Sequence, residues 1–250
     1  MGVKILIQEV AKNIYSFGVT LPNSPLKLIN AYVVKGENRT VLFDTGFNNP
    51  QSEAELLAGL QELGIEIKNL EVVLTHLHAD HTGLIHLFKH AGCKIYMSQI
   101  DGEHANGMIT GKYWHQLDEL LALFGLQEDQ IDNNDNPGFI NQPSEAFAYI
   151  ELVPGEKFVI GGYDFDVLNL IGHTPGHIGF FDEKSGVLIS ADTVLDPMCG
   201  SGTTNVEAAL IGINSIGVDI SPFCKLMASV KHQCLYVNLL HLENLINYQK

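Results

Sequence analysis

The stretch Glu71-Val-Val-Leu-Thr-His-Leu-His-Ala-Asp-His81 decides the fold of this chain. Its first residues form a short apolar run typical of a buried strand, and the histidines follow where that strand ends. Imidazole nitrogens and carboxylate oxygens are natural ligands of zinc-type ions. Two histidines two residues apart reach one ion, whereas Asp80 and His81 point elsewhere, so the pattern suits two neighbouring ions. An ordinary polar loop is a poor fit to this composition, and we expect a metal site here.

Strands and helices alternate on both sides of this stretch through residue 194. Apolar residues at helical spacing predict a helix over residues 52–63 that stops at Gly64. The alternation predicts an α/β domain. Strand patterns occupy residues 3–7, 13–19, 28–34, 40–43, 71–75, 93–97, 157–160, 163–170 and 187–191.

The charge of the chain is strongly acidic and unevenly distributed. Its 250 residues include 14 basic and 29 acidic side chains, for a formal charge of −15. Residues 1–194 account for a net charge of −14, and residues 195–250 for −1. Phosphates are repelled by such a surface, so we expect neither nucleic-acid nor anionic-membrane binding. This change in charge near residue 194 is a first sign that the last quarter of the chain differs in origin from the rest.

The ends and the cysteines of the sequence give no sign of export. Charged residues interrupt the apolar residues of the N-terminus, which therefore lacks a signal-peptide core, and no apolar run reaches the length of a membrane span. The four cysteines form no Cys-x-x-Cys pair, and their spacing fits neither a disulfide framework nor a zinc knuckle. We therefore expect a cytoplasmic protein.

Two later segments add further candidate ligands at strand ends. These are Gly172-His-Thr-Pro-Gly-His177 and Ser190-Ala-Asp192. Taken alone, each is weak, because a single histidine or aspartate in a turn is more often a capping or core residue. Together with the histidines at 76–81 they complete a ligand set drawn from several strand ends, which is how α/β enzymes build sites.

These motifs, with Asp44-Thr-Gly before them, resemble in their order the successive motifs of the metallo-β-lactamase superfamily across residues 1–194. The resemblance implies an αββα sandwich, in which two β-sheets lie between helices and the metals lie at one edge. It also implies a first zinc held by three histidines, a second held by an aspartate and a histidine, and a carboxylate that bridges them. In that order, the implied ligands are His76, His78 and His173, then Asp80 and His81, then Asp192.

The resemblance also implies the chemistry. Two cations lower the pKa of a bridging water, so that a metal-bound hydroxide attacks a carbonyl that the ions polarise. Asp80 is the implied catalytic residue, because it orients the nucleophile and later carries a proton to the leaving group. Asp44 supports the loop from behind, and His177 lies near the metals without ligating them. We therefore expect a zinc-dependent hydrolase of a small ester, thioester or lactone, with a small-molecule substrate.

The chain departs from this family after Asp192. The family supplies one more histidine on a later strand, which is not evident here, since His232 and His241 lie in surroundings typical of helices. Whether one or two zinc ions bind therefore stays open.

The segment from Val194 to Thr204 is instead similar to the S-adenosylmethionine-binding turn of DNA and RNA methyltransferases. There an acidic strand end leads into a glycine turn at a helix start, and the next strand carries a carboxylate for the ribose hydroxyls. The matching residues are Asp196, Gly200, Gly202 and Asp219. The resemblance implies a hydrolase domain at 1–194, whose sandwich is truncated at its C-terminal end. A methyltransferase-like fragment, a short Rossmann-like βαβα segment, continues it over 195–250.

The fragment lacks the Asp/Asn-Pro-Pro-aromatic element that orients the target amine in that family. S-adenosylmethionine is therefore a candidate cofactor that we do not expect to be functional. Two alternatives to the hydrolase stay open, a methyltransferase fragment and an inactive chimera of the two pieces.

Two structural expectations concern segments outside the ligand motifs. If the tail replaces the closing elements of the sandwich, the strand at 215–220 pairs beside the strand at 187–191. The insertion at 98–150, with Tyr113, Trp114 and Phe124, forms either a partly apolar lid over the metals or an ordinary packed helix pair.

Overall fold

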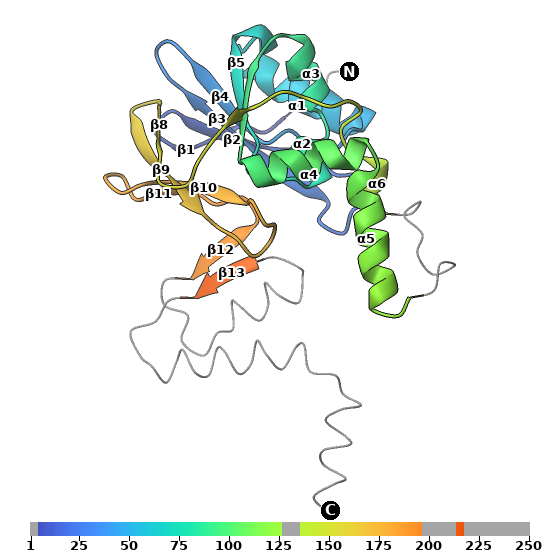
Figure 1. The fold of residues 1–250 in the computed structure, drawn as a ribbon. Coiled ribbons are helices and arrows are strands. Elements are labelled where there is room, and N and C mark those ends of the chain that lie inside the picture. Colours follow the sequence, from blue (N-terminus) through green and yellow to red (C-terminus); the bar gives the residue numbers. More distant parts are fainter. Residues whose placement is uncertain (1–4, 127–135, 197–213, 218–250) are drawn as a thin grey trace, which may run out of the picture. The chain divides into compact units, whose positions relative to one another are not determined.

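The computed structural model describes residues 5–126, 136–196 and 214–217. The chain divides into two compact units, Met1–Ile189 and Ser190–Lys250. Figure 1 shows the elements of each unit coloured along the sequence. Within the described residues, none of the helices combines the length and the apolar character that a membrane crossing needs.

A seven-stranded mixed sheet forms the larger layer of the first unit. Its strands lie in sequence order, antiparallel from β1 to β4 and parallel from β4 to β7. The change of direction occurs where helix α1 (Pro50–Glu62) enters between β4 and β5, because parallel neighbours need a crossover connection. The strands are β1 Gln8–Ala11, β2 Ile14–Thr20, β3 Leu28–Lys35, β4 Thr40–Phe43, β5 Leu70–Val73, β6 Lys94–Met97 and β7 Ile150–Glu151.

The first strand lies later in the chain than its apolar run predicts. Residues 5–7 are not in a strand, and β1 begins at Gln8. A tight turn at Asn13, with φ of 65°, pairs Ala11 with Ile14 and so fixes which residues face β2. The turn thus overrides the hydrophobic pattern at this edge of the sheet.

A four-stranded antiparallel sheet, in the order β11-β10-β9-β8, packs on one face of the larger sheet, with which it shares a buried core. The core between the two sheets is rich in aromatic rings. Phe43 of β4 meets Phe180 of β10 edge to face with ring centroids 5.0 Å apart, a favourable aromatic geometry. The strands are β8 Lys157–Ile160, β9 Tyr163–Asn169, β10 Ile178–Asp182 and β11 Val187–Ile189.

Helices cover the other face of the larger sheet (Figure 1). Helix α1 begins at the cap residue Asn49, whose side chain accepts from the Gln51 amide, and ends before Gly64, as the sequence predicts. Leu56 and Leu60 of α1 join the buried core under the sheet. The remaining helices are η1 Ile67–Asn69, α2 Ala79–Thr82, α3 Ile85–His90, α4 Gln99–Ile109, α5 Lys112–Leu123 and α6 Pro137–Ile140.

The insertion at 98–150 contains a packed helix pair, α4 and α5. Trp114 is buried, its indole Nε1 donates to Gln142 Oε1 at 2.8 Å, and its ring meets those of Tyr113 and Phe139 edge to face. Phe124, just past α5, is 76% exposed. The positions of Tyr113 and Trp114 therefore agree with a packed helix pair, one of the two interpretations of this insertion.

The second unit contains a parallel pair of strands, β12 (Thr193–Asp196) and β13 (Asn214–Gly217). The prediction that this later strand pairs beside 187–191 is wrong, since β13 pairs with β12 and β11 pairs with β10. Residues 197–213 between the two strands are long enough for the crossover that a parallel pair requires, whereas a tight antiparallel turn needs far fewer residues.

Candidate metal centre

The loop after β5 carries four of the predicted ligands. His76 and His78 lie in the loop that follows the strand, after Leu74 and Thr75, and the single turn of α2 then presents Asp80 and His81. The loop is anchored from the neighbouring strand end, where the Thr45 amide and hydroxyl both donate to the His81 carbonyl at 2.9 Å. His76 and His81 are buried, which holds their rings in fixed positions.

Asp44 braces this loop from behind. Its carboxylate accepts from the Thr75 amide and the Thr75 hydroxyl, each at 2.9 Å, and its Oδ2 lies 2.8 Å from His81 Nδ1. Asp44 itself has a φ of 61°, in the left-handed region, so the chain turns sharply here. A carboxylate beside Nδ1 favours a proton on that nitrogen, which leaves Nε2 of His81 to bind a cation.

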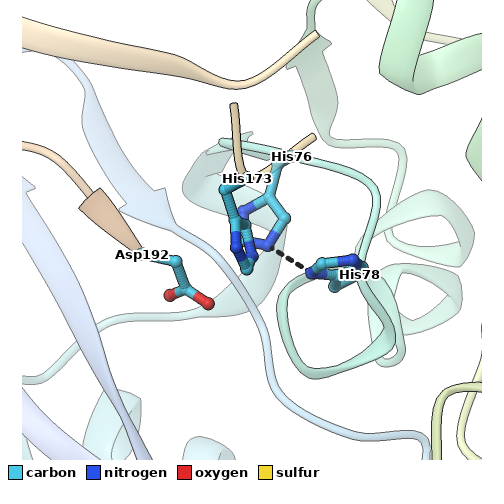
Figure 2. A group of neighbouring side chains, drawn as sticks. All are labelled: His76, His78, His173 and Asp192. Atoms are coloured by element: carbon cyan, nitrogen blue, oxygen red, sulfur yellow. Dashed lines mark hydrogen bonds between the residues drawn. The ribbon is translucent and has the colours of Figure 1, made fainter. Parts of the chain in front are cut away.

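Three imidazoles converge in the first unit. One ring nitrogen each of His76, His78 and His173 lies within 4.8 Å of the others, and His76 Nε2 is 3.1 Å from His78 Nδ1. Figure 2 shows the three rings turned toward one another, with this short N···N approach dashed. Neutral imidazole nitrogens gathered at one point are the donor set that zinc and other divalent transition metals prefer. These residues therefore fit a metal ion.

Asp80 and His81 form a second, adjoining pair of donors. Asp80 Oδ2 lies 3.7 Å from His81 Nε2, the ring nitrogen opposite the one that faces Asp44. The rings of His76 and His81 are 3.9 Å apart between centroids, so the two groups of donors are neighbours. Asp80 and His81 are both buried. A carboxylate and an imidazole at this spacing also suit a divalent cation.

His173 belongs to the loop between β9 and β10. The Leu170 amide donates to the His177 carbonyl at 2.9 Å and closes this loop, and the Ile178 amide donates to the Thr75 carbonyl at 3.0 Å. The second contact ties the loop to the end of β5. His177 is fully buried and packs its ring 4.9 Å from that of His76. Each ligand loop therefore contacts the other.

The remaining predicted residues lie in the second unit or outside the described residues. Asp192 comes just before β12, and its role as a bridging ligand stays a prediction. Asp196 is the last residue of β12. Gly200, Gly202 and Asp219 lie outside the described residues, as do His232 and His241.

Sequence reasoning missed one buried carboxylate beside this centre. Asp101, in the first turn of α4, is fully buried and accepts hydrogen bonds from both ligand loops. Burial raises the pKa of Asp101, and the hydrogen bonds from Thr174 and Gly176 oppose that rise. The only sequence signal is the spacing Ser98-x-x-Asp101, which is typical of a capping box at a helix start.

Comparison with known proteins places these motifs in a family. The model of the metallo-beta-lactamase superfamily matches residues 25–216. Hydroxyacylglutathione hydrolase GloC of Haemophilus influenzae is 30% identical over 164 residues, which are 63% of this chain and 66% of that protein. Matches to the first curated relatives span between about half and two thirds of their lengths.

A solved structure shows the same fold. The metallo-beta-lactamase family protein TTHA1429 from Thermus thermophilus superposes with a TM-score of 0.65 at 22% identity, covering 91% of this chain and 81% of that one. Together with the family match, this likeness confirms the predicted α/β fold of metallo-β-lactamase type.

The methyltransferase resemblance is confined to a short stretch. The type II methyltransferase M.MjaII of Methanocaldococcus jannaschii is 60% identical over 42 residues, which are 17% of this chain and 8% of that enzyme. A match of this length shows a shared segment and no more, so the domain boundary near residue 194 stays a prediction.

Proposed function

The chain belongs to the metallo-beta-lactamase superfamily, and we propose that it is a zinc-dependent hydrolase of a small ester, thioester or lactone. The observation that carries this proposal is the convergence of ring nitrogens from His76, His78 and His173 within 4.8 Å. The name of its relative, hydroxyacylglutathione hydrolase, supports a substrate with an activated acyl group.

The residues that would hold the metal are those the two loops bring together. The three converging histidines suit a first ion, and Asp80 with His81 suits a second. Asp192 is the proposed bridging ligand. When bound, a divalent ion supplies Lewis acidity, which polarises a carbonyl and lowers the pKa of water. Whether one or two ions bind is the first property to measure.

The chain's own residues prepare the site for acyl transfer. Asp44 orients His81 through its Nδ1, so that the Nε2 side faces Asp80. We assign proton transfer to Asp80, which would accept a proton at a carboxylate oxygen and return it to the leaving group. Because Asp80 is buried, water competes poorly for that carboxylate, and its interactions are strengthened.

The charge of the chain sharpens the substrate class. A formal charge of −15 disfavours polyphosphate substrates such as nucleic acids, so we propose a small molecule as the partner. A methyltransferase function is not favoured, because the matches that suggest it cover 17–22% of the chain.

The test is metal stoichiometry on the purified full-length protein, beside His78→Ala and His115→Ala. His115 is an exposed histidine of α5 and serves as the matched control. We expect one or two equivalents of zinc in the wild type and in His115→Ala, and fewer in His78→Ala. The same three proteins are assayed on a nitrophenyl ester, an acylglutathione and a lactone, and only His78→Ala should lose hydrolysis. A wild type that binds no metal would overturn the proposal and favour an inactive chimera.

A further inference from the structure

The start of α4 contains a capping box with an unusual acid. Ser98 caps the helix and its hydroxyl oxygen accepts from the Asp101 amide, which is the usual arrangement. In a complete capping box the acid three residues on reaches back to the cap residue's amide. Here the Asp101 carboxylate accepts instead from three donors that lie outside the helix. The Asp101 side chain therefore connects the start of α4 to other segments of the chain.

Those three donors belong to the two ligand loops. The Leu77 amide, between His76 and His78, donates to Asp101 Oδ2 at 3.1 Å. The Thr174 hydroxyl donates to the same oxygen, and the Gly176 amide donates to Oδ1 at 2.8 Å. A single buried carboxyl group thus accepts hydrogen bonds from both loops.

The approach of the second loop to α4 is close. The Ser98 hydroxyl donates to the Gly176 carbonyl at 2.6 Å. A Cβ on Gly176 would lie 2.6 Å from Ser98 Oγ and 2.7 Å from the Asp101 amide nitrogen, closer than real Cβ contacts. The chain therefore needs a glycine here for Asp101 to reach the loop.

The hydrogen bonds from the two loops to Asp101, here called the clamp, bear on metal binding because the ligands must be held at fixed separations. Metal–nitrogen bonds to zinc are about 2.0–2.1 Å long, so three imidazoles from two loops must keep their separation within a few tenths of an ångström. Three hydrogen bonds that converge on one buried carboxyl group hold their donors in place, because water competes poorly for the acceptor.

We propose that Asp101 is a positioning residue, which sets the separation between the loop of His76 and His78 and the loop of His173, and thereby the affinity for metal. The predicted effect on metal affinity rests on the function proposed above. The role of Asp101 in holding the two loops together does not depend on that function.

The test compares Asp101→Asn with Asp182→Asn in the full-length protein. Asparagine keeps the shape but replaces one acceptor by a donor. Asp182 is a matched control because it is also buried and its carboxylate accepts from the Ser185 amide and hydroxyl and from the Asp164 amide, in the second sheet. Zinc affinity is measured by competition with a chromophoric chelator, and ligand geometry by the visible spectrum of the cobalt(II) form.

We expect Asp101→Asn to weaken zinc binding by about 10- to 100-fold, the usual effect of losing an outer partner of the ligands, and to change the cobalt spectrum. Asp182→Asn should leave both unchanged. Equal behaviour of the two variants would overturn the proposal. If Asp101→Asn does not fold, Thr174→Val removes a single donor and should shift zinc affinity in the same direction by a smaller factor.

Hydrogen exchange of the metal-free protein separates this proposal from the proposed function. The amides of Leu77 and Gly176 donate to Asp101, so they should lose protection in Asp101→Asn and keep it in Asp182→Asn. Unchanged protection in Asp101→Asn would overturn the clamp. A wild type without zinc affinity would overturn the proposed function, and the exchange result would still decide the role of Asp101.

Discussion

The two ligand loops are held in different ways. The loop of His76 to His81 is braced by the end of the neighbouring strand, through Asp44 and Thr45. The loop of His173 includes Ile171, which is 61% exposed. Besides the backbone bond from Ile178 to Thr75, its described hydrogen bonds to elements other than its flanking strands are to Ser98 and Asp101 at the start of α4. The first loop is thus braced by the larger sheet as well as by Asp101, through the Leu77 amide, whereas the second relies more on the start of α4. Substitutions that act on one support at a time test this difference.

The largest effect is expected at the support of the first loop. Asp44→Ala removes the acceptor of the buried Thr75 amide and the carboxylate beside His81. Leaving a buried donor unpaired costs about 1–3 kcal/mol, so for these two groups we expect the free energy of unfolding to fall by roughly 2–6 kcal/mol. Urea unfolding measures the loss, and zinc content should fall with it. A variant with wild-type stability and zinc content would show that Asp44 is not the support of this loop.

A substitution that crowds the second loop should have a smaller effect on stability. Gly176→Ala places a Cβ 2.7 Å from the backbone nitrogen of Asp101, so the loop must move away from α4. Overpacking of this kind costs about 1–3 kcal/mol. Gly107→Ala, in the same helix α4, is the control, because its Cβ would make only ordinary contacts at 3.7 Å. Thermal unfolding of both variants, with zinc affinity, checks the prediction. Equal behaviour would contradict the close approach.

The first loop could be predicted from sequence because its signal is local. A short apolar strand and the histidines that follow it are neighbours in the chain, and strand ends are where α/β folds gather ligands. The fold class follows from the same alternation, and the helix at 52–63 is observed as α1, Pro50–Glu62.

The support of the second loop could not be predicted in this way. Asp101 contacts Leu77 and Gly176, which lie far from it in the chain, so only the folded arrangement brings them together. Its sequence signal, the capping box, predicts only where a helix begins. The partner of β13 was predicted wrongly for the same reason, since strand pairing between distant segments depends on the crossover between them. Local sequence patterns predict helices and strands, whereas the contacts that hold one loop against another form only in the folded chain.

A smaller effect within the first loop is expected at Thr75. Its hydroxyl lies 2.9 Å from Asp44 Oδ2 and 3.1 Å from His76 Nδ1, so it links the support to a ligand. Thr75→Val keeps the shape and the backbone contact but removes the hydroxyl. This should lower the free energy of unfolding by about 1 kcal/mol, the contribution of one ordinary hydrogen bond. Thr110→Val, at the exposed end of α4, is the control. Zinc affinity should fall only in Thr75→Val, and an equal change in both variants would mean that the hydroxyl does not orient His76.

The smallest effect is expected far from both loops and depends on pH. The Ser185 hydroxyl and the Asp164 and Ser185 amides donate to Asp182, which lowers the pKa of Asp182 below the usual 3.8. A lowered pKa means that the folded state favours the ionised form, so its contribution to stability is present at neutral pH. It is lost as the pH falls from about 3.8 through the lowered pKa.

Urea unfolding of the wild type and Asp182→Asn at neutral pH and at about pH 3 measures this contribution. The stability difference between the two proteins should shrink at the lower pH. The zinc affinity of Asp182→Asn at neutral pH should equal that of the wild type, because none of the hydrogen bonds described for its carboxylate reaches a ligand loop. A difference that stays constant with pH would mean that these donors do not favour the ionised carboxylate. A weaker zinc affinity would mean that the second sheet also supports the loop of His173, and the contrast between the two loops would then extend beyond α4.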